Sequence, residues 1–421
     1  MTYENSLRFA RQMDREDSLR HWQKAFYIPR HNGKPCIYLT GNSLGLQPKG
    51  TAAALQQELA DWRMYGVEGH FKAKHPWFGY HHRFTRSLGR LLGARPAEVV
   101  AMNQLTVNLN LLLISFYRPT KRKNKILLEA NAFPSDRFAC QSHLRLQGQH
   151  PENDLWELPL SEDGATHRTA DIIAFLEKKG GEIALFLLGG VNYYSGQFFE
   201  LKKIAAVCRR LGITFGVDLA HAIGNVPLKL HDWDVDFATW CSYKYLNSGP
   251  GGVSGVFIHD RHHHDKHIPR LEGWWGNRES SRFQMGKVFD AAIGAEAWQM
   301  SNAPVLSMAA HRAALDIFDE AGMPALRRKS ELLSGYLFWL LHQSRQADAP
   351  YTIITPSRAA DRGCQVSIRL MRKGKDVFHK LSKQGVVADW REPDVVRVAP
   401  VPLYNSFTDV YRFVQLFQAA L

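Results

Sequence analysis

Apolar positions along this chain fall into short continuous runs separated by longer stretches with helical spacing. The short runs are typical of strands buried on both faces of a sheet, and they occupy residues 37–40, 126–129, 183–188, 213–218 and 253–258. Helical spacing fills much of the chain between them, at residues 51–65, 83–95, 109–116 and 200–210. Strands that alternate with helices in this way predict a mostly parallel sheet covered by helices.

The pattern changes toward the end of the chain. Helical spacing extends from about residue 291 to about residue 347 and is interrupted at Pro304. It is followed by strand-like runs at 364–371, 385–389 and 395–399, with helices at 377–384 and 407–421. Runs of this kind predict a small α+β domain with an antiparallel sheet.

Three parts of the chain follow from these patterns. Residues 1–50, which have helical character up to about residue 30, are expected to contribute to the small domain and to a ligand site. Residues 51–308 are expected to form a large domain and residues 309–421 the small α+β domain. A chain of 421 residues is long enough for one large and one smaller domain.

The stretch from residue 213 to residue 257 carries the strongest candidate chemistry. One strand-like run ends on Asp218, His221 follows it, and Lys244 lies between two tyrosines ahead of the glycine-rich segment 249–252. A pyridoxal phosphate (PLP) site needs such a lysine to form a Schiff base and such a carboxylate to keep the pyridine nitrogen protonated. Taken singly, the Asp could be a helix cap and the glycines a hairpin turn. Their combination at the ends of successive strands favours a cofactor site.

Other polar segments have both a structural and a functional interpretation. The aromatic and His-rich segment 66–82 could be a surface loop or the cover of a site for an aromatic anion. Polar residues at 102–108 precede an apolar helix, where they could simply cap it or bind phosphate. The segment 271–277 holds two tryptophans between glycines and is a candidate cofactor loop.

Charge and cysteine content exclude several classes of protein. The net charge of +13 is spread along the chain, and no basic and aromatic stripe supports nucleic-acid binding, the alternative from a different functional class. An anionic small-molecule substrate accounts for part of the excess. Five scattered cysteines without CxxC spacing argue against a disulfide framework or a zinc site, and the His-rich run 262–264 lacks partner ligands, so no metal is expected. The polar N-terminus and the lack of a long apolar run predict a cytoplasmic protein that does not bind membranes.

Four motifs resemble the kynureninase family, PLP-dependent hydrolases of fold type I (the aspartate aminotransferase superfamily), in both order and spacing. They are GNSLGLQPK at 41–49, FPSD at 133–136, the long segment from DLAH to GPGG at 218–252, and RVAPVPLYNSF at 397–407. The resemblance covers nearly the whole chain. It implies a large domain with a mostly parallel sheet, a small C-terminal α+β domain and a homodimer with shared active sites.

The resemblance also assigns roles to individual residues. Lys244 would form the Schiff base with PLP, Asp218 would pair with the pyridine nitrogen, and Phe133 would stack on the ring. The other implied cofactor contacts are Leu105, Thr106, Pro134, Ser135, Asp136, His221, Tyr243, Asn302 and, from the neighbouring subunit, Trp274. The implied substrate contacts are Ser43, His70, Asn302 and Arg397, of which Arg397 would bind the α-carboxylate through its planar fork.

The implied reaction is hydrolysis of the Cβ–Cγ bond of L-kynurenine or 3-hydroxy-L-kynurenine, which gives anthranilate or its 3-hydroxy form and L-alanine. Tyr243 would assist as acid or base, as a tyrosine can if neighbouring cations lower its pKa. Relatives often carry a hydroxyl where this chain has Gly189, so that phosphate contact is in question. The alternative within fold type I is a cysteine-desulfurase-like lyase, for which Cys364 is the candidate nucleophile, although its alternating strand favours a core position.

Overall fold

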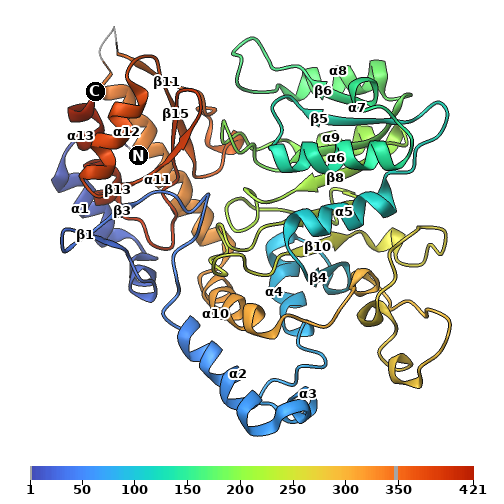
Figure 1. Ribbon diagram of the computed structural model, residues 1–421. Helices are drawn as coiled ribbons and strands as arrows, with labels where there is room; N and C mark the ends of the chain where they lie inside the picture. Colours follow the sequence, from blue (N-terminus) through green and yellow to red (C-terminus); the bar gives the residue numbers. More distant parts are fainter. Residues whose placement is uncertain (1, 346–348) are drawn as a thin grey trace.

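The central feature of the computed structural model, which describes residues 2–345 and 349–421, is a seven-stranded sheet (Figure 1). Five adjacent strands are parallel, whereas β10 is antiparallel to both of its neighbours. In spatial order the strands are β4 (Val99–Ala101), β10 (Gly255–Ile258), β9 (Phe237–Trp240), β8 (Thr214–Asp218), β7 (Ile183–Gly189), β5 (Lys125–Glu129) and β6 (Leu155–Leu158). This confirms the mostly parallel sheet predicted from the apolar runs.

Helices cover both faces of this sheet, which explains why its strands are continuously apolar. In β7, Leu185 and Leu187 enter one core while Phe186 and Leu188 enter the other. The first core is closed by α5 (Leu105–Phe116) and α6 (Pro134–Leu146). The second is closed by α4 (His82–Leu92), α8 (Thr169–Lys179), α9 (Leu201–Arg210) and α10 (Val305–Ala321).

The C-terminal part forms a separate four-stranded antiparallel sheet, as predicted. Its strands are, in spatial order, β11 (Tyr351–Ile353), β12 (Val366–Leu370), β15 (Val395–Val398) and β14 (Asp389–Arg391). The helices of this part are α11 (Met323–Gln343), α12 (Gly374–Lys383) and α13 (Phe407–Ala420). Ser406 and Asp409 form a capping box at the start of α13.

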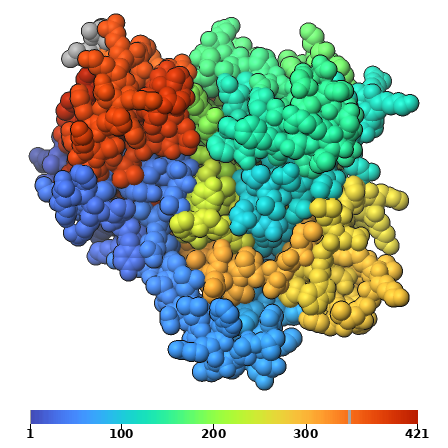
Figure 2. All heavy atoms as spheres, viewed as in Figure 1, coloured from blue at the N-terminus to red at the C-terminus, as the bar shows by residue number. Residues whose placement is uncertain are grey.

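The N-terminal segment lies against this C-terminal part, blue against red in Figures 1 and 2. Helix α1 (Leu7–Glu16) packs on α13, and β3 (Ile37–Tyr38) pairs in parallel with β13 (Val386–Val387). Helix α2 (Thr51–Tyr65) follows this segment. The remaining strands and α-helices are short: β1 (Arg30–His31), β2 (Lys34–Pro35), α3 (Gly69–Lys72) and α7 (Pro151–Asp154). The 3₁₀ turns include η1 (Arg20–Ala25), η5 (Trp274–Gly276), η6 (Arg282–Gln284) and η7 (Ala295–Trp298). In the described part of the chain, no helix combines the length and the apolar character needed to cross a bilayer.

Some expected helices differ from the observed ones. The helix expected from residue 291 begins only at Val305, because Gly294 adopts a φ of 89° and Pro304 occupies the N-cap position. Helical character at residues 1–30 is confined to α1 and η1. The helix expected from residue 109 already starts at Leu105, and the end of the expected helix at 346–347 lies outside the described residues.

Candidate active site

A cavity of about 140 Å³ opens where three neighbouring parallel strands end. Glu129 ends β5, Gly189 ends β7 and Asp218 ends β8, and all three residues line the cavity. The chain leaves β5 toward β6 on one side and later forms β7 on the other side. The loops diverge at such a switch point, which is where open α/β sheets bind ligands.

Lys244 reaches this cavity on the segment that follows β9. Its Nζ lies 3.1 Å from Nε2 of His221 and 5.7 Å from the centre of the Phe133 ring. Burial lowers the pKa of Lys244, which favours the neutral, nucleophilic amine. Burial, followed by the charge of Lys244, also lowers the pKa of His221 well below its usual range. The cavity therefore holds a neutral imidazole next to an amine that loses its proton easily.

Three carboxyl groups share the cavity with this single lysine: Glu129, Asp136 and Asp218. Burial raises the pKa of all three groups, and the nearby Asp218 carboxylate raises that of Asp136 further. One Asp218 oxygen accepts the amide proton of Ala220 at 2.7 Å, whereas Oδ1 of Asp136 is buried without a partner. A buried carboxyl oxygen without a partner, next to a second carboxyl group, suits a positively charged hydrogen-bond donor. The protonated pyridine nitrogen of PLP fits this requirement.

The other end of the cavity suits a phosphate group. Leu105 and Thr106 begin α5, Ser135 lies in the first turn of α6, and all three residues line the cavity. The Oγ atoms of Thr106 and Ser135 lie 2.7 Å apart. Free N–H groups and the dipole at a helix N-terminus favour an anion, and the two hydroxyls add side-chain donors. This end therefore also fits PLP.

Gly189 and Tyr243 line the cavity but differ from what the family resemblance implies for a phosphate contact and for an acid or base with a lowered pKa. Gly189 brings no hydroxyl, and its N–H points to both Glu129 oxygens at 3.3 Å, so that carboxyl takes up the free amide. The pKa of Tyr243 is raised, by burial first and then by the thiol of Cys241, and no cation lowers it. Tyr243 therefore carries its proton at neutral pH and can donate it.

Arg397, an expected substrate contact, does not line the cavity and is fully buried. Its Nη1 donates to the carbonyl oxygen of Tyr193 at 2.5 Å, and the Tyr193 ring contacts Phe133 edge-to-face at 5.3 Å. Its Nε and Nη2 lie 3.0 and 2.9 Å from Oδ1 of Asp389. Hydrogen bonds thus connect Arg397 to the backbone of a cavity residue.

Several expected site residues do not line this cavity within one chain. Ser43 belongs to a turn that touches the site, because the N–H of Gly45 donates to the carbonyl oxygen of Tyr243 at 2.8 Å. His70 lies on α3, where Nδ1 bonds the carbonyl oxygen of Val67, Asn302 is exposed, and Trp274 is 51% exposed. Pro134 is the first residue of α6 and also does not line the cavity.

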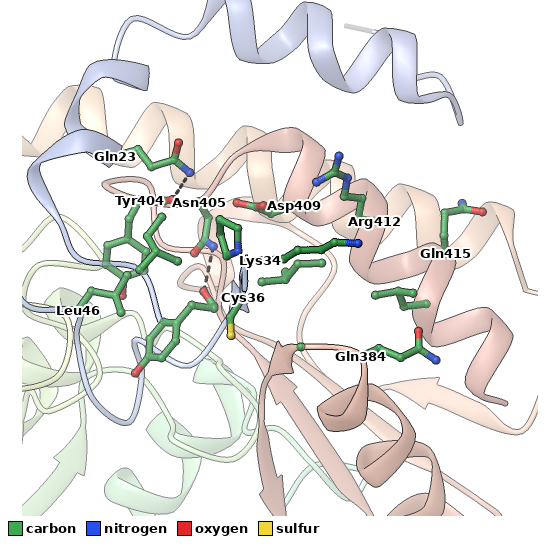
Figure 3. Close-up of a pocket in the computed structure, with 16 residues that line it drawn as sticks. Gln23, Lys34, Cys36, Leu46, Gln384, Tyr404, Asn405, Asp409, Arg412 and Gln415 are labelled. Carbon is green, nitrogen blue, oxygen red and sulfur yellow. Dashed lines mark hydrogen bonds between the residues drawn. The ribbon is translucent and has the colours of Figure 1, made fainter. Parts of the chain in front are cut away.

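Sequence reasoning missed Glu129 as a site residue, although it recognised the strand. A carboxylate directly after a buried apolar run, as at Asp218, was the available signal. Cys241 and Tyr193, which also line the cavity, had no such signal, because both belong to loops. A larger hollow of about 470 Å³ between the N-terminal segment and α13 contains none of the expected site residues (Figure 3).

Comparison with solved structures establishes the fold class. A variant of C-DES with glycine linked covalently to its PLP cofactor superimposes with a TM-score of 0.77 at 18% identity, over 91% of this chain and 96% of that one. The cysteine desulfurase CsdA from Escherichia coli gives a TM-score of 0.77 at 15% identity, over 96% and 98%. At these identities the similarity concerns the fold, and it confirms fold type I.

Comparison at the level of sequence establishes the family. Residues 326–417 match the family model described as "Kynureninase C-terminal domain". The kynureninase of Myxococcus xanthus is 51% identical over 99% of this chain and 97% of its own length. Those of Flavobacterium johnsoniae and Koribacter versatilis are 48% and 50% identical, and each alignment covers 100% of this chain and 99% of the relative. With this identity over its full length, the chain belongs to the kynureninase family.

Proposed function

We propose that this enzyme hydrolyses the Cβ–Cγ bond of L-kynurenine or 3-hydroxy-L-kynurenine with PLP as cofactor, as a step of tryptophan catabolism. The products are L-alanine and anthranilate or 3-hydroxyanthranilate. The observation that carries the proposal is the Lys244 amine buried among Asp136, Asp218 and His221 at the switch point of the sheet. Relatives named kynureninase that match the full chain at about half identity select this reaction among those of fold type I.

We assign the contacts to the pyridine ring of PLP to the carboxyl end of the cavity and the contacts to its phosphate to the end with the helix N-termini. Lys244 would bind PLP covalently, and Asp136 and Asp218 would hold the proton on its pyridine nitrogen. Phe133, which is 37% exposed, offers a ring face for stacking. Leu105, Thr106, Ser135 and Tyr243 would hold the phosphate. The uncompensated carboxyl groups and the helix N-termini described above support this orientation.

When bound, PLP supplies an electron sink that stabilises negative charge on the substrate carbons near the amine. Lys244 would take the proton from the α-carbon, because burial favours its neutral amine. Water would add to the γ-carbonyl and become part of the carboxylate of the aromatic product. Tyr243, which is protonated at neutral pH, would donate a proton to the β-carbon as the Cβ–Cγ bond breaks. Arg397 would bind the α-carboxylate of the substrate, with its charge held in place by Asp389.

Completion of the site by a second copy of the chain is part of the proposal. His70, Trp274 and Asn302 lie away from the cavity of their own chain, as expected if Trp274 and Asn302 serve the partner's site. The segment that carries Trp274 has several exposed apolar side chains, of which Phe283 contacts Trp274, and these support a covered surface there: Leu271 (48%), Phe283 (55%), Met285 (75%) and Ile293 (59%).

The cellular and domain assignments rest on separate observations. All five cysteines are free, which suits a reducing compartment, so we place the enzyme in the cytoplasm. The sequence predicts the segment 1–50, the large domain 51–308 and the small domain 309–421. Because α10 (Val305–Ala321) closes the second core of the large sheet, we place the boundary between the two domains after Ala321. The presence of one sheet in each of the two larger parts supports this division.

A direct assay tests the reaction. PLP-loaded protein is incubated with L-kynurenine and with 3-hydroxy-L-kynurenine, and alanine and the aromatic amine are both measured. Cleavage of either substrate supports the proposal, and the ratio of the two kcat/KM values gives the preference. Cleavage of neither substrate, together with release of sulfur from cysteine, would replace the proposal with the desulfurase-like alternative.

Mixed dimers test the shared site. Lys244→Ala lacks the amine and should be inactive, whereas Trp274→Ala lacks the indole and should be poorly active at limiting PLP. Unfolding and refolding the two together should restore part of the activity if Trp274 acts across the interface, since one site of the mixed dimer is then intact. Activity that stays at the sum of the separate variants would place Trp274 outside the partner's site.

A further inference from the structure

His81 and His82 face Glu296 at a position well separated in sequence from the Lys244 site. His82 is the first residue of α4, and Glu296 lies in η7. The Nε2 atoms of His81 and His82 lie 3.4 Å and 2.9 Å from the same Glu296 oxygen, Oε1. The rings are tilted by 52° with centroids 4.1 Å apart, and the three ligand atoms lie within 4.8 Å of one another. These residues do not line the Lys244 cavity.

His81 is an unusual feature of this group. It is only 1% exposed, its Nδ1 has no partner among the described residues, and its Nε2, 3.4 Å from Oε1 of Glu296, makes no hydrogen bond of good geometry. Leaving a buried polar group unpaired is costly, so a missing ligand is the simplest explanation.

The surrounding charges are compatible with a cation. Glu296 and Glu279 act on His82 together with one positive residue, Arg282. The Arg282 guanidinium lies over the rings of Phe78 and Trp275, at 5.2 Å and 4.4 Å from their centres. Its Nη2 also donates to the carbonyl oxygen of Trp275 at 2.9 Å. Its charge is therefore partly satisfied elsewhere, and the local carboxylates outnumber it.

We propose that His81, His82 and Glu296 bind one divalent transition-metal ion, such as zinc. Two imidazoles and one carboxylate are a typical ligand set for such ions, with water in the remaining positions. The side chain of His82 is 45% exposed and gives the ion a path of entry. The ion would link the start of α4 to the segment that carries Trp274 and Asn302. Its role is structural.

A second group with metal-ligand chemistry, Glu98, His231, His259 and Asp260, is already satisfied internally. Nδ1 of His231 lies 2.8 Å from Oε1 of Glu98, which also accepts the amide proton of Asp260 at 2.9 Å. Nδ1 of His259 accepts a hydrogen bond from the amide of Arg261 at 3.2 Å. This group needs no ion, in contrast to His81.

Metal titration of the PLP-loaded enzyme, dialysed first against a chelator, tests the proposal. Calorimetry with zinc chloride should give one equivalent per chain, and cobalt chloride should give visible absorption bands of a cobalt–imidazole site. His82→Ala and Glu296→Gln should each weaken zinc binding by at least about 100-fold, the upper end of the loss expected from an outer-shell partner alone. His264→Ala, which removes an exposed histidine from the run 262–264, is the matched control and should bind zinc like the wild type.

The variants avoid the fully buried His81, so their fold should be retained, and the absorbance of bound PLP and circular dichroism verify this. Absence of stoichiometric zinc binding by the wild-type enzyme would overturn the proposal. Equal zinc affinity of the wild type, His82→Ala and Glu296→Gln would also overturn it, because the ion would then bind elsewhere.

Discussion

Arg397 offers a test that separates substrate binding from support of the fold. In the structure its guanidinium holds two partners, Asp389 and the carbonyl oxygen of Tyr193, and the proposed function adds the α-carboxylate of the substrate. Substitution by Ala should therefore have two independent effects. Stability should fall because Asp389 loses a partner, and kcat/KM should fall because the substrate loses its cation.

The structure sets the size of both effects. Removal of one partner from a buried ion pair costs about 3–5 kcal/mol, and Arg391 limits the loss, since its Nε lies 2.9 Å from the same Asp389 oxygen. We expect the lower end, about 3 kcal/mol, in the free energy of unfolding. A hydrogen bond to a charged group contributes about 1.5–3 kcal/mol, which corresponds to a loss of about 10- to 150-fold in kcat/KM, mostly through KM.

Urea unfolding and steady-state kinetics with L-kynurenine measure the two effects separately. Asp389→Asn is the matched control: it weakens the same ion pair but leaves the guanidinium, so stability should fall while KM changes much less. Arg397→Lys keeps the charge without the planar fork and should fall between the wild type and Arg397→Ala in KM. If Arg397→Ala is destabilised but retains the wild-type KM, Arg397 only anchors β15 to Tyr193 and does not bind the carboxylate.

Three further predictions concern residues of the cavity and the core. Lys244→Ala should lose the absorbance of covalently bound PLP and all multiple turnover, and retained turnover would exclude its assigned role. Burial raises the pKa of Glu129 from 4.5 to about 7, so the folded state binds this proton more tightly and cofactor-free stability should fall as the pH rises from about 4.5 to 7. This pH-dependent loss of unfolding free energy amounts to about 3 kcal/mol at pH 8. Glu129→Gln should remove it, which urea unfolding of both proteins at pH 5 and pH 8 measures. Equal pH dependence of the two proteins would contradict the assignment. Cys364→Ala should cleave kynurenine within about twofold of the wild type, because the buried thiol has a pKa of about 12 and is not a nucleophile; a large loss of activity would reopen the lyase alternative.

The strands of the large sheet could be predicted because burial on both faces leaves a simple signal. The run at Ile183–Gly189 is apolar throughout, since its alternate side chains enter two cores. Two strands were missed. Strand β4 (Val99–Ala101) has too few residues to show a period, and the edge strand β6 (Leu155–Leu158) is only partly buried and contains the exposed Glu157. The helix expected from residue 291 was placed too early because composition there remains apolar while the backbone at Gly294 turns to positive φ.

Some residues of the site could also be predicted from the sequence, whereas others could not. Asp218 and Lys244 could be linked from sequence because parallel strands end at the same edge of a sheet, so residues after successive strands converge. The contact between Glu129 and the amide of Gly189 depends on β5 and β7 being neighbours, which chain order does not reveal since β6 lies between them in sequence. His81 and Glu296 likewise meet only through tertiary packing.

The small volume of the cavity bears on the proposal that two chains share each active site. About 140 Å³ is less than the roughly 300–1,000 Å³ of typical ligand pockets, although the chemistry of the lining fits PLP. His70, Trp274 and Asn302, which the family resemblance assigns to cofactor and substrate, lie outside it and are partly or largely exposed. A cavity that holds the cofactor-binding side chains but lacks these three residues is expected if a second chain supplies the missing surface. The small cavity and the exposed tryptophan thus support the same proposal of shared active sites from independent observations.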